Sequence, residues 1–285
     1  MNDNTFASRG ARLKDIFFTA VCCAFSLFHI YTAYFGIASG MRQRIVHLTF
    51  ALFLTFWFYP LKAGKRSLLD WIVTAVLLVA SMVSCVHIFL LDPELPFREG
   101  QINPVDIVLG LIMIVAVLES TRRVTGWALP VTSLFFIVYA FIGPYMPGIL
   151  SHRGFSLSRI VYVLFLTTEG IYGIALYVSS TFIILFIILA AFLKETGIGE
   201  FFIEIAYGLF GRFRGGPAKV AVIASGFFGT FSGSAIANVT GTGTFTIPLM
   251  VRTGFSPQFA AAVEAVASTG GQFMPPIMAS VAFVI

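Results

Sequence analysis

A run of small polar residues lies in apolar surroundings between Gly229 and Leu249, where the sequence reads GTFSGSAIANVTGTGTFTIPL. Its serines, threonines and asparagine carry hydroxyl and amide oxygens, and its glycines leave the backbone carbonyls accessible. Oxygens of these kinds coordinate hard monovalent cations. The run could therefore hold an ion, provided that the fold brings several of these oxygens together.

A second unusual stretch follows at 267–276, ASTGGQFMPP. Ser256 and Pro257 are a favourable N-cap and first-turn pair for the helix that leads into it. Two glycines and two prolines within a few residues then interrupt a helix, and we expect them to free carbonyls of the segment 268–271. The C-terminal end of the interrupted helix adds a negative dipole. A flexible kink with close packing of small residues is the alternative interpretation.

The composition indicates the environment of these stretches. Of the 285 residues, 58% are hydrophobic and 11% are charged, whereas soluble domains contain about 25% charged residues. We therefore expect an all-α integral membrane protein, a bundle of several spans. Cys22, Cys23 and Cys85 lie in apolar runs without disulfide or metal-ligand spacing. Because the sequence shows no Ser/His/Asp set, HExxH motif or paired carboxylates, we expect no enzyme and no cofactor other than a coupling ion.

Apolar runs long enough to cross a bilayer of ~30 Å place the spans. We predict them at 16–38, 45–60, 68–91, 104–119, 127–143 and 173–193. With the N-terminus in the cytoplasm, thirteen of the 18 basic residues fall inside and five outside. This bias predicts a cytoplasmic N-terminus and accounts for the net charge of +5 without a nucleic-acid partner.

The charge count also places the polar run. Lys219 and Arg252 both fall on the cytoplasmic side, and the segment between them is too short for two full spans, which need ~40 residues. We therefore predict a re-entrant hairpin at 217–254, with legs of ~20 Å and a non-helical tip over 232–243. A broken helix at 257–285 follows it. The shorter runs 160–166 and 200–210 are predicted to lie along the outer and cytoplasmic surfaces.

These residues carry a resemblance to a known family. The passage RGGPAKVAVIASGFFGTFSGSAIANVTGTGTFTIPLMVRTGF and the later AAAVEAVASTGGQFMPPIMASVAF resemble the large membrane subunit of tripartite ATP-independent periplasmic (TRAP) transporters. LTTEGIYG at 166–173 and AFLKETG at 191–197 look like the branch that uses TAXI-type binding proteins. In that branch the small subunit is fused to the large one. The resemblance thus implies a four-helix small-subunit part at 1–125, a connecting helix at 126–150 and the first half of the large subunit at 151–285.

The resemblance implies a function as well. Such permeases are sodium-coupled secondary transporters of the bacterial inner membrane, which import organic acids delivered by a periplasmic solute-binding protein. They work as elevators built from two inverted repeats. Carried over residue by residue, the family's sodium site corresponds to Ser232, Gly233, Ser234, Gly270, Gly271 and Pro275, with Pro276 beside it. Further candidates for contact with substrate or ion are Asn238, Thr240, Ser268, Thr269 and Glu264.

Several alternatives stay open at this stage. The sequence ends at SVAFVI with only the first repeat, so we expect a partial chain whose partner is the second half of the large subunit. A channel-like or structural membrane module with a re-entrant segment is the rival function. Glu264 is either functional or paired with Lys219 or Arg252. His29 and His87 are packing residues or a proton relay, and outer Asp106 and Glu169 are solvated or help to dock the binding protein.

Overall fold

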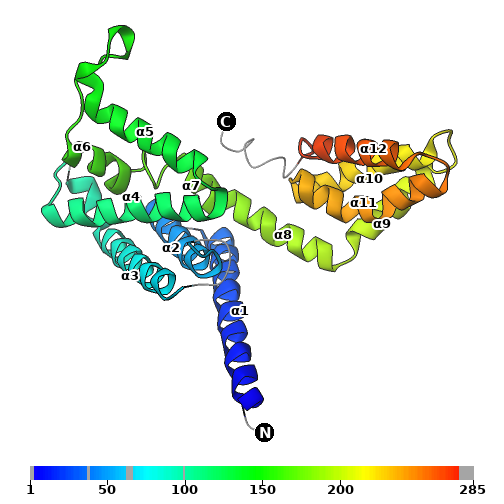
Figure 1. The fold of residues 1–285 in the computed structure, drawn as a ribbon, viewed down its shortest axis with the longest axis horizontal. Helices are drawn as coiled ribbons and strands as arrows, with labels where there is room; N and C mark the ends of the chain where they lie inside the picture. The colour runs from blue at the N-terminus through cyan, green and yellow to red at the C-terminus, as the bar shows by residue number, and fades with distance from the viewer. Residues whose placement is uncertain (1–2, 37–38, 62–66, 99, 276–285) are drawn as a thin grey trace. The chain divides into compact units, whose positions relative to one another are not determined.

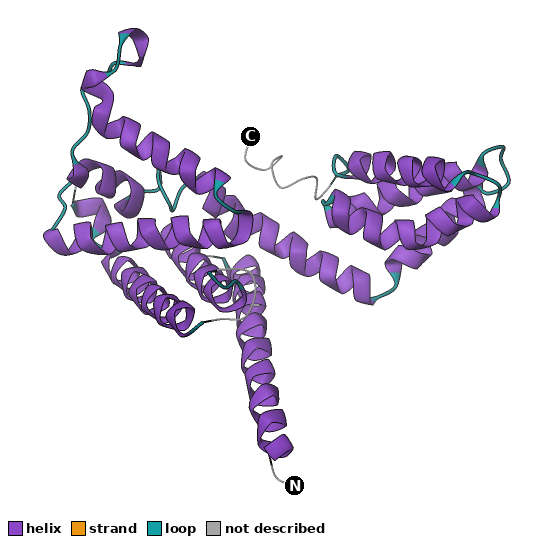
Figure 2. Ribbon diagram, in the orientation of Figure 1, coloured by secondary structure: helices purple, strands orange, loops and turns teal. Residues whose placement is uncertain are grey.

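The computed structural model describes residues 3–36, 39–61, 67–98 and 100–275, and every element in these ranges is helical (Figure 2). The chain divides into two compact units, Met1–Ser180 and Thr181–Ile285. The prediction of an all-helical, multi-span protein is therefore confirmed. The units record which helices pack together and do not test the domain boundaries at 125 and 150, which stay predictions.

The first unit is a bundle of long helices followed by short ones (Figure 1). Its long helices are α1 (Asp3–Phe35), α2 (Gly40–Phe58), α3 (Leu68–Leu91), α4 (Pro104–Thr125) and α5 (Ala128–Ile142). The short elements are α6 (Leu157–Val161), a π-helical turn η4 (Tyr162–Leu166) and α7 (Ile174–Val178). A second π-helical turn, η5 (Ser179–Ile183), leads into the second unit.

Four stretches are long and apolar enough to cross a membrane, namely Asp15–Phe35, Leu68–Leu91, Pro104–Thr125 and Ala128–Tyr145. They coincide with four of the predicted spans. The predicted span at 45–60 corresponds to α2, whose 19 residues begin five residues earlier than expected. The predicted span at 173–193 is not one uniform α-helix, because η5 interrupts it.

The core of the first unit forms where α2, α3 and α4 pack together. Gly110 on α4 has no side chain, and this allows Val161 and Phe165 to pack directly against its backbone. Both of these residues are fully buried. Part of the segment 160–166 thus packs in the core, because the glycine leaves space for its apolar side chains. Its place along the outer surface stays a prediction.

The loop after η4 is held by α2. Arg44 donates a hydrogen bond to the Tyr172 carbonyl, and its guanidinium carbon lies 4.9 Å from the centre of the Tyr177 ring. The Tyr172 side chain is fully buried, which raises the pKa of its hydroxyl well above the usual value. The LTTEGIYG sequence is thus an anchored turn of the first unit.

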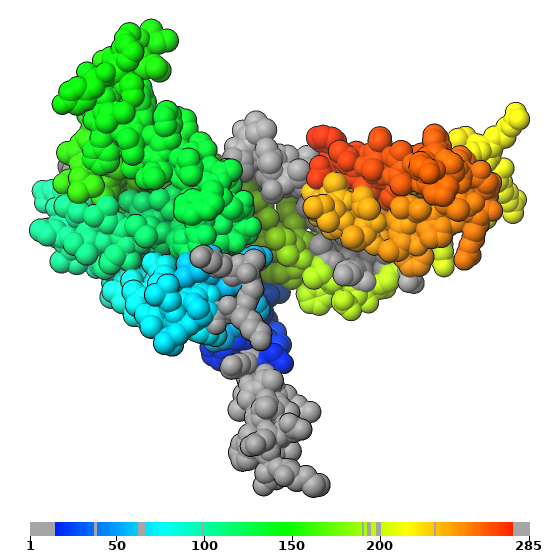
Figure 3. Space-filling view, viewed as in Figure 1, coloured from blue at the N-terminus to red at the C-terminus, as the bar shows by residue number. Residues whose placement is uncertain are grey.

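The second unit contains α8 (Ile184–Glu195), α9 (Ile198–Phe210), α10 (Gly216–Ser232), α11 (Ala235–Arg252) and α12 (Pro257–Gly271). The last three pack against one another in all pairs, and the face seen in Figure 3 shows the side chains of α11 and α12 in contact. α9 packs on α10 through Ala206, which is fully buried, while Phe201 and Leu209 remain exposed. α9 therefore faces α10 through Ala206, and the prediction that 200–210 lies along the cytoplasmic surface stays a prediction.

Candidate functional site

A helical hairpin forms where sequence analysis placed it. α10 ends at Ser232, Gly233 takes a left-handed φ of 57°, and Ser234 caps α11 by accepting a hydrogen bond from the Ala237 amide. The turn is therefore only two residues long. The prediction of a non-helical tip reaching Gly243 is wrong, because Ser234 is an effective N-cap that restarts the helix at once. At 1.5 Å per residue, the 17 residues of α10 give a leg of ~26 Å, longer than expected.

The C-terminal parts of α10 and α12 touch through two glycines. A Cβ atom added to Gly229 would overlap the Gly271 carbonyl, and one added to Gly271 would overlap the Asn238 amide nitrogen. The same atom on Gly271 would lie 2.9 Å from the Ser225 carbonyl oxygen. The hairpin and the end of α12 are thus brought together, as the sequence predicted, at a separation that only glycine permits.

The predicted broken helix, 257–285, is described only as far as 275, and its second half lies outside the described residues. α12 runs through Gly271, and its last carbonyls, of Thr269, Gly270 and Gly271, accept hydrogen bonds from the amides of 272, 273 and 274 in turn. The segment 268–271 is therefore helical, not unwound as predicted, because the two glycines fit the last helical turn and the chain turns only after them. Each of these carbonyl oxygens keeps a second lone pair that could bind an ion.

A buried polar cluster joins the three helices. Asn238 on α11 donates to the Ser225 carbonyl at 2.9 Å and accepts from the Ser225 hydroxyl at 3.1 Å. The Ser225 and Ser268 hydroxyl oxygens are 3.2 Å apart. All three residues are fully buried. Each side chain comes from a different helix, so the cluster fixes α10, α11 and α12 relative to one another.

Glu264 lies at the centre of the same cluster and is fully buried. Its carboxylate accepts from Thr242 and Thr246, each at 2.5 Å, and from Ser268 at 3.1 Å. A Cβ on Gly243 would lie 3.0 Å from the Glu264 Cγ, so this glycine makes room for the carboxylate. The hypothesis that Glu264 pairs with Lys219 or Arg252 is wrong, because hydroxyl groups at helical spacing on α11 occupy both of its oxygens.

The remaining predicted site residues have different surroundings. The Ser232 hydroxyl is buried and has no hydrogen-bond partner within the described part of the chain. Gly270 has open space around its Cα, Pro275 is exposed beyond α12, and Pro276 lies outside the described residues. Thr240 and Thr269 are exposed, and their hydroxyls bond to carbonyls of their own helices. The structure thus brings together Asn238, Ser268, Glu264 and Gly271, and leaves Thr240 and Thr269 outside.

Sequence analysis missed three members of the cluster, Ser225, Thr242 and Thr246. A signal for two of them was present: Asn238, Thr242 and Thr246 are spaced by four residues and therefore share one face of α11. The same spacing relates Glu264 to Ser268 on α12. Two polar faces of this kind on neighbouring helices are expected to meet, since each needs hydrogen-bond partners in an apolar environment.

Two clusters of hydrogen-bonded polar side chains in the first unit contain histidines. His29 contacts Gln43 and His47 at 3.1 Å each, and His47 contacts the Ser179 hydroxyl at 3.1 Å. This arrangement agrees with hydrogen-bonded packing, although a proton relay through it is not tested. His87 lies 2.7 Å from Asp106.

Asp106 is 1% exposed and also accepts from Arg98 at 3.0 Å. The hypothesis that Asp106 helps to dock a binding protein is therefore wrong, because three donors hold its carboxylate inside the bundle. Glu169 is exposed, so its docking role stays a prediction.

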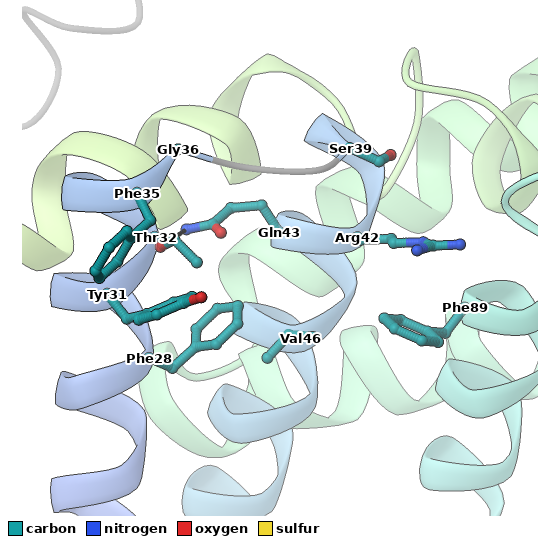
Figure 4. A pocket seen from close by; sticks show the side chains of 10 residues that line it. All are labelled: Phe28, Tyr31, Thr32, Phe35, Gly36, Ser39, Arg42, Gln43, Val46 and Phe89. Atoms are coloured by element: carbon teal, nitrogen blue, oxygen red, sulfur yellow. Dashed lines mark hydrogen bonds between the residues drawn. The ribbon is translucent and has the colours of Figure 1, made fainter.

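A groove of about 560 Å³ crosses the N-terminal end of α2 between α1 and α3 (Figure 4). Aromatic side chains of Phe28, Tyr31 and Phe35 form one wall, and Phe89 lies on the other side near Arg42. The Arg42 guanidinium forms an ion pair with the Asp92 carboxylate at 3.0 Å, so its positive charge is already balanced. Among the described residues, no group of three His, Cys, Asp or Glu side chains could hold a transition metal.

Comparison with known proteins identifies a family. Residues 112–285, more than half of the chain, match the family model described as "Tripartite ATP-independent periplasmic transporter, DctM component". The C4-dicarboxylate TRAP transporter large permease protein DctM of Vibrio cholerae is 31% identical over 161 residues, which cover 54% of this chain and 35% of the relative. The protein of the same name from Pseudomonas aeruginosa is 35% identical over 98 residues, 34% of this chain and 23% of the relative.

A further relative is the isethionate TRAP transporter permease protein DctMQ of Oleidesulfovibrio alaskensis, 30% identical over 175 residues, 60% of this chain and 27% of the relative. No solved structure shows a significant match. The chain spans about a third or less of the length of these relatives. The family match includes all of α10, α11 and α12, and hence the hairpin, the end of α12 and the buried cluster. The chain therefore belongs to the DctM family of TRAP transporter permeases.

Proposed function

We propose that this chain is a permease component of a sodium-coupled TRAP transporter that imports organic acids across the bacterial inner membrane. One observation carries the proposal beyond family membership: the hairpin α10–α11 meets the end of α12 through Gly229 and Gly271. Two helix C-termini with their partial negative charges are thereby brought close to each other. Half-helix ends and backbone carbonyls of this kind coordinate coupling ions in secondary transporters.

The residues around this contact suit a sodium ion as the co-transported substrate. Among the described residues, the Ser232 hydroxyl at the end of α10 is buried without a hydrogen-bond partner, and a buried hydroxyl of this kind is costly unless something binds it. Gly233 and Ser234 follow at the turn, and the Gly270 and Gly271 carbonyls retain free lone pairs at the end of α12. We assign the ion to these five residues, with Pro275 ending the helical segment beside them.

The partner and the mode of movement extend the same proposal. A periplasmic solute-binding protein of the TAXI type would deliver the organic acid, and a second repeat would complete the substrate cavity. The hairpin would enter and leave the membrane on the cytoplasmic side and move with α12 as part of an elevator. The compact packing of α10, α11 and α12 on one another supports their movement as one body. The names of two relatives refer to C4-dicarboxylates and to isethionate, both organic anions.

Uptake of a labelled organic acid into proteoliposomes tests the proposal. The complete permease, reconstituted with a binding protein, should accumulate the acid when sodium is outside and should stop when potassium replaces sodium. Replacing Ser232 with alanine should weaken the response to sodium, while Ser158→Ala, on the short helix α6 of the first unit, serves as the control. Equal uptake with potassium would contradict sodium coupling.

A channel-like or structural module is the second candidate function. Such a module should conduct ions in planar bilayers without any binding protein and should show no saturation with the solute. Requirement for both sodium and a binding protein, in the same proteoliposomes, would exclude it.

A further inference from the structure

We propose that Glu264 is the positioning residue of the ion site at the end of α12. It does not touch the assigned ion-binding residues. It acts through Ser268 and Asn238, which together determine where Gly271 lies against α10. The inference rests on the proposed sodium site and adds to it a residue whose effect on that site is indirect.

The contacts form a continuous path. The Glu264 Oε1 atom accepts from the Ser268 hydroxyl at 3.1 Å, and the Ser268 and Ser225 hydroxyl oxygens are 3.2 Å apart. Ser225 then holds Asn238 by two hydrogen bonds, at 2.9 and 3.1 Å. The Asn238 amide nitrogen lies so close to Gly271 that no Cβ fits between them. The path therefore runs from the Glu264 carboxylate to the Gly271 backbone at the end of α12.

Hydrogen counting shows that the carboxylate orients this path. Each hydroxyl has one hydrogen to donate. When Thr242, Thr246 and Ser268 all donate to Glu264, the Ser225 hydroxyl donates to the side-chain amide oxygen Oδ1 of Asn238, and every hydroxyl of the cluster donates once. The Asn238 amide is then fixed with its nitrogen toward Gly271. Networks of this kind, once fully satisfied, hold a single arrangement.

If the Glu264 carboxylate were removed, Ser268 would be the residue left without an alternative acceptor outside the cluster. Thr242 and Thr246 also lie 2.9 and 3.1 Å from carbonyls one turn earlier on α11, so both could donate there instead. Within the described residues, Ser268 has only Glu264 and Ser225 as hydrogen-bond partners. Without Glu264, Ser268 would compete for Ser225 and disturb its bond to Asn238. We therefore expect the position of Gly271 to change more than the packing of the three helices elsewhere.

Glutamine and alanine at position 264 should behave differently. The glutamine oxygen can accept from Thr242 and Ser268, and its amide can donate to Thr246, whose own hydrogen can turn to the Thr242 carbonyl. The Ser268 path is then preserved. Alanine removes the acceptor altogether. A positioning role thus predicts rescue by glutamine, whereas a direct need for the carboxylate charge predicts that both variants fail.

The test measures sodium dependence in the complete permease with its binding protein. In proteoliposomes, Glu264→Ala should raise the sodium concentration for half-maximal uptake by about tenfold or more, as for other residues that orient metal ligands. The KM for the solute-loaded binding protein should stay unchanged. Glu264→Gln should remain within about threefold of the native protein. Gln258→Ala, at an exposed position of the same helix, is the control and should have no effect.

Two further measurements complete the test. The double variant Glu264→Ala/Ser268→Ala should be no worse than Glu264→Ala alone, because both interrupt one path. Amide hydrogen exchange of the segment 268–275 should accelerate in Glu264→Ala and not in Glu264→Gln. Additive losses in the double variant, failure of Glu264→Gln, or unchanged exchange and sodium response in Glu264→Ala would each overturn the inference. If uptake by the native permease does not depend on sodium, the proposed sodium coupling is wrong. The hydrogen-exchange measurement then still decides whether Glu264 positions the end of α12.

Discussion

Gly229 on α10 and Gly271 on α12 meet backbone to backbone, so that a side chain on either would overlap the other helix. This contact joins the hairpin to the C-terminal end of α12. A Cβ on Gly229 would meet only backbone atoms of Gly271, and one on Gly271 would meet the hydrogen-bonded Asn238 amide and the Ser225 carbonyl, so neither helix can make room by a simple rotamer change.

Alanine at position 271 should therefore destabilise the second unit by about 1–3 kcal/mol through overpacking. Gly270 is the matched comparison, since a Cβ there meets nothing within 4 Å. Gly270→Ala should leave thermal stability unchanged or raise it slightly, because alanine is favoured over glycine in a helix by ~1 kcal/mol. Melting curves of the purified variants compare the two. Equal behaviour of Gly270→Ala and Gly271→Ala would contradict the close contact.

The threonines of α11 offer a second comparison. Thr242 is buried and donates to Glu264, whereas Thr244 is exposed and bonds only to a carbonyl of its own helix. Thr242→Val keeps the shape but removes the donor, and it should destabilise the protein by about 1–3 kcal/mol because a buried acceptor loses a partner. Thr244→Val should change stability by less than about 0.5 kcal/mol. Thermal unfolding in one detergent would measure both, and a larger loss for Thr244→Val would refute the arrangement.

Arg98 provides a comparison in the first unit, since it pairs with one buried and one exposed acid. Asp106 is 1% exposed, whereas the Glu94 side chain is 67% exposed. Asp106→Ala leaves Arg98 and His87 without their shared partner and should destabilise the unit by about 1–3 kcal/mol. Glu94→Ala should cost no more than about 1 kcal/mol, as exposed ion pairs contribute little. Comparable melting temperatures for the two variants would show that the buried cluster is not needed for stability.

Much of this fold was accessible from the sequence because its signals are local. Four span positions followed from apolar length alone, and the hairpin from glycine, proline and charge at its ends. The burial of 160–166 was not accessible, because it depends on Gly110, some fifty residues earlier, leaving space for Val161 and Phe165. Apolar residues of a short segment look the same whether they face lipid or protein.

In the candidate site, too, the polar residues could be predicted from local sequence, whereas their partners could not. Asn238, Ser268 and Glu264 were recognisable as polar residues in an apolar region, and the structure brings them together. Which partner Glu264 takes was not recognisable: the charges of Lys219 and Arg252 suggested ion pairs, yet the hydroxyls of Thr242 and Thr246 lie nearer. An ion pair would need Lys219 or Arg252 to come close to the carboxylate. Thr242 and Thr246 face it directly, because residues spaced by four share one face of α11.

The orientation of the chain in the membrane can also be tested. The bias of basic residues predicts both a cytoplasmic N-terminus and the side from which the hairpin enters. Glu94 lies after α3 and Thr125 ends α4, and both are exposed. In a background with Cys22, Cys23 and Cys85 replaced, Glu94→Cys should react with a membrane-impermeant thiol reagent in intact cells. Thr125→Cys should react only after permeabilisation, since basic residues at the end of α4 hold that end in the cytoplasm. The opposite labelling pattern would place the N-terminus outside and would reverse the entry side of α10 and α11.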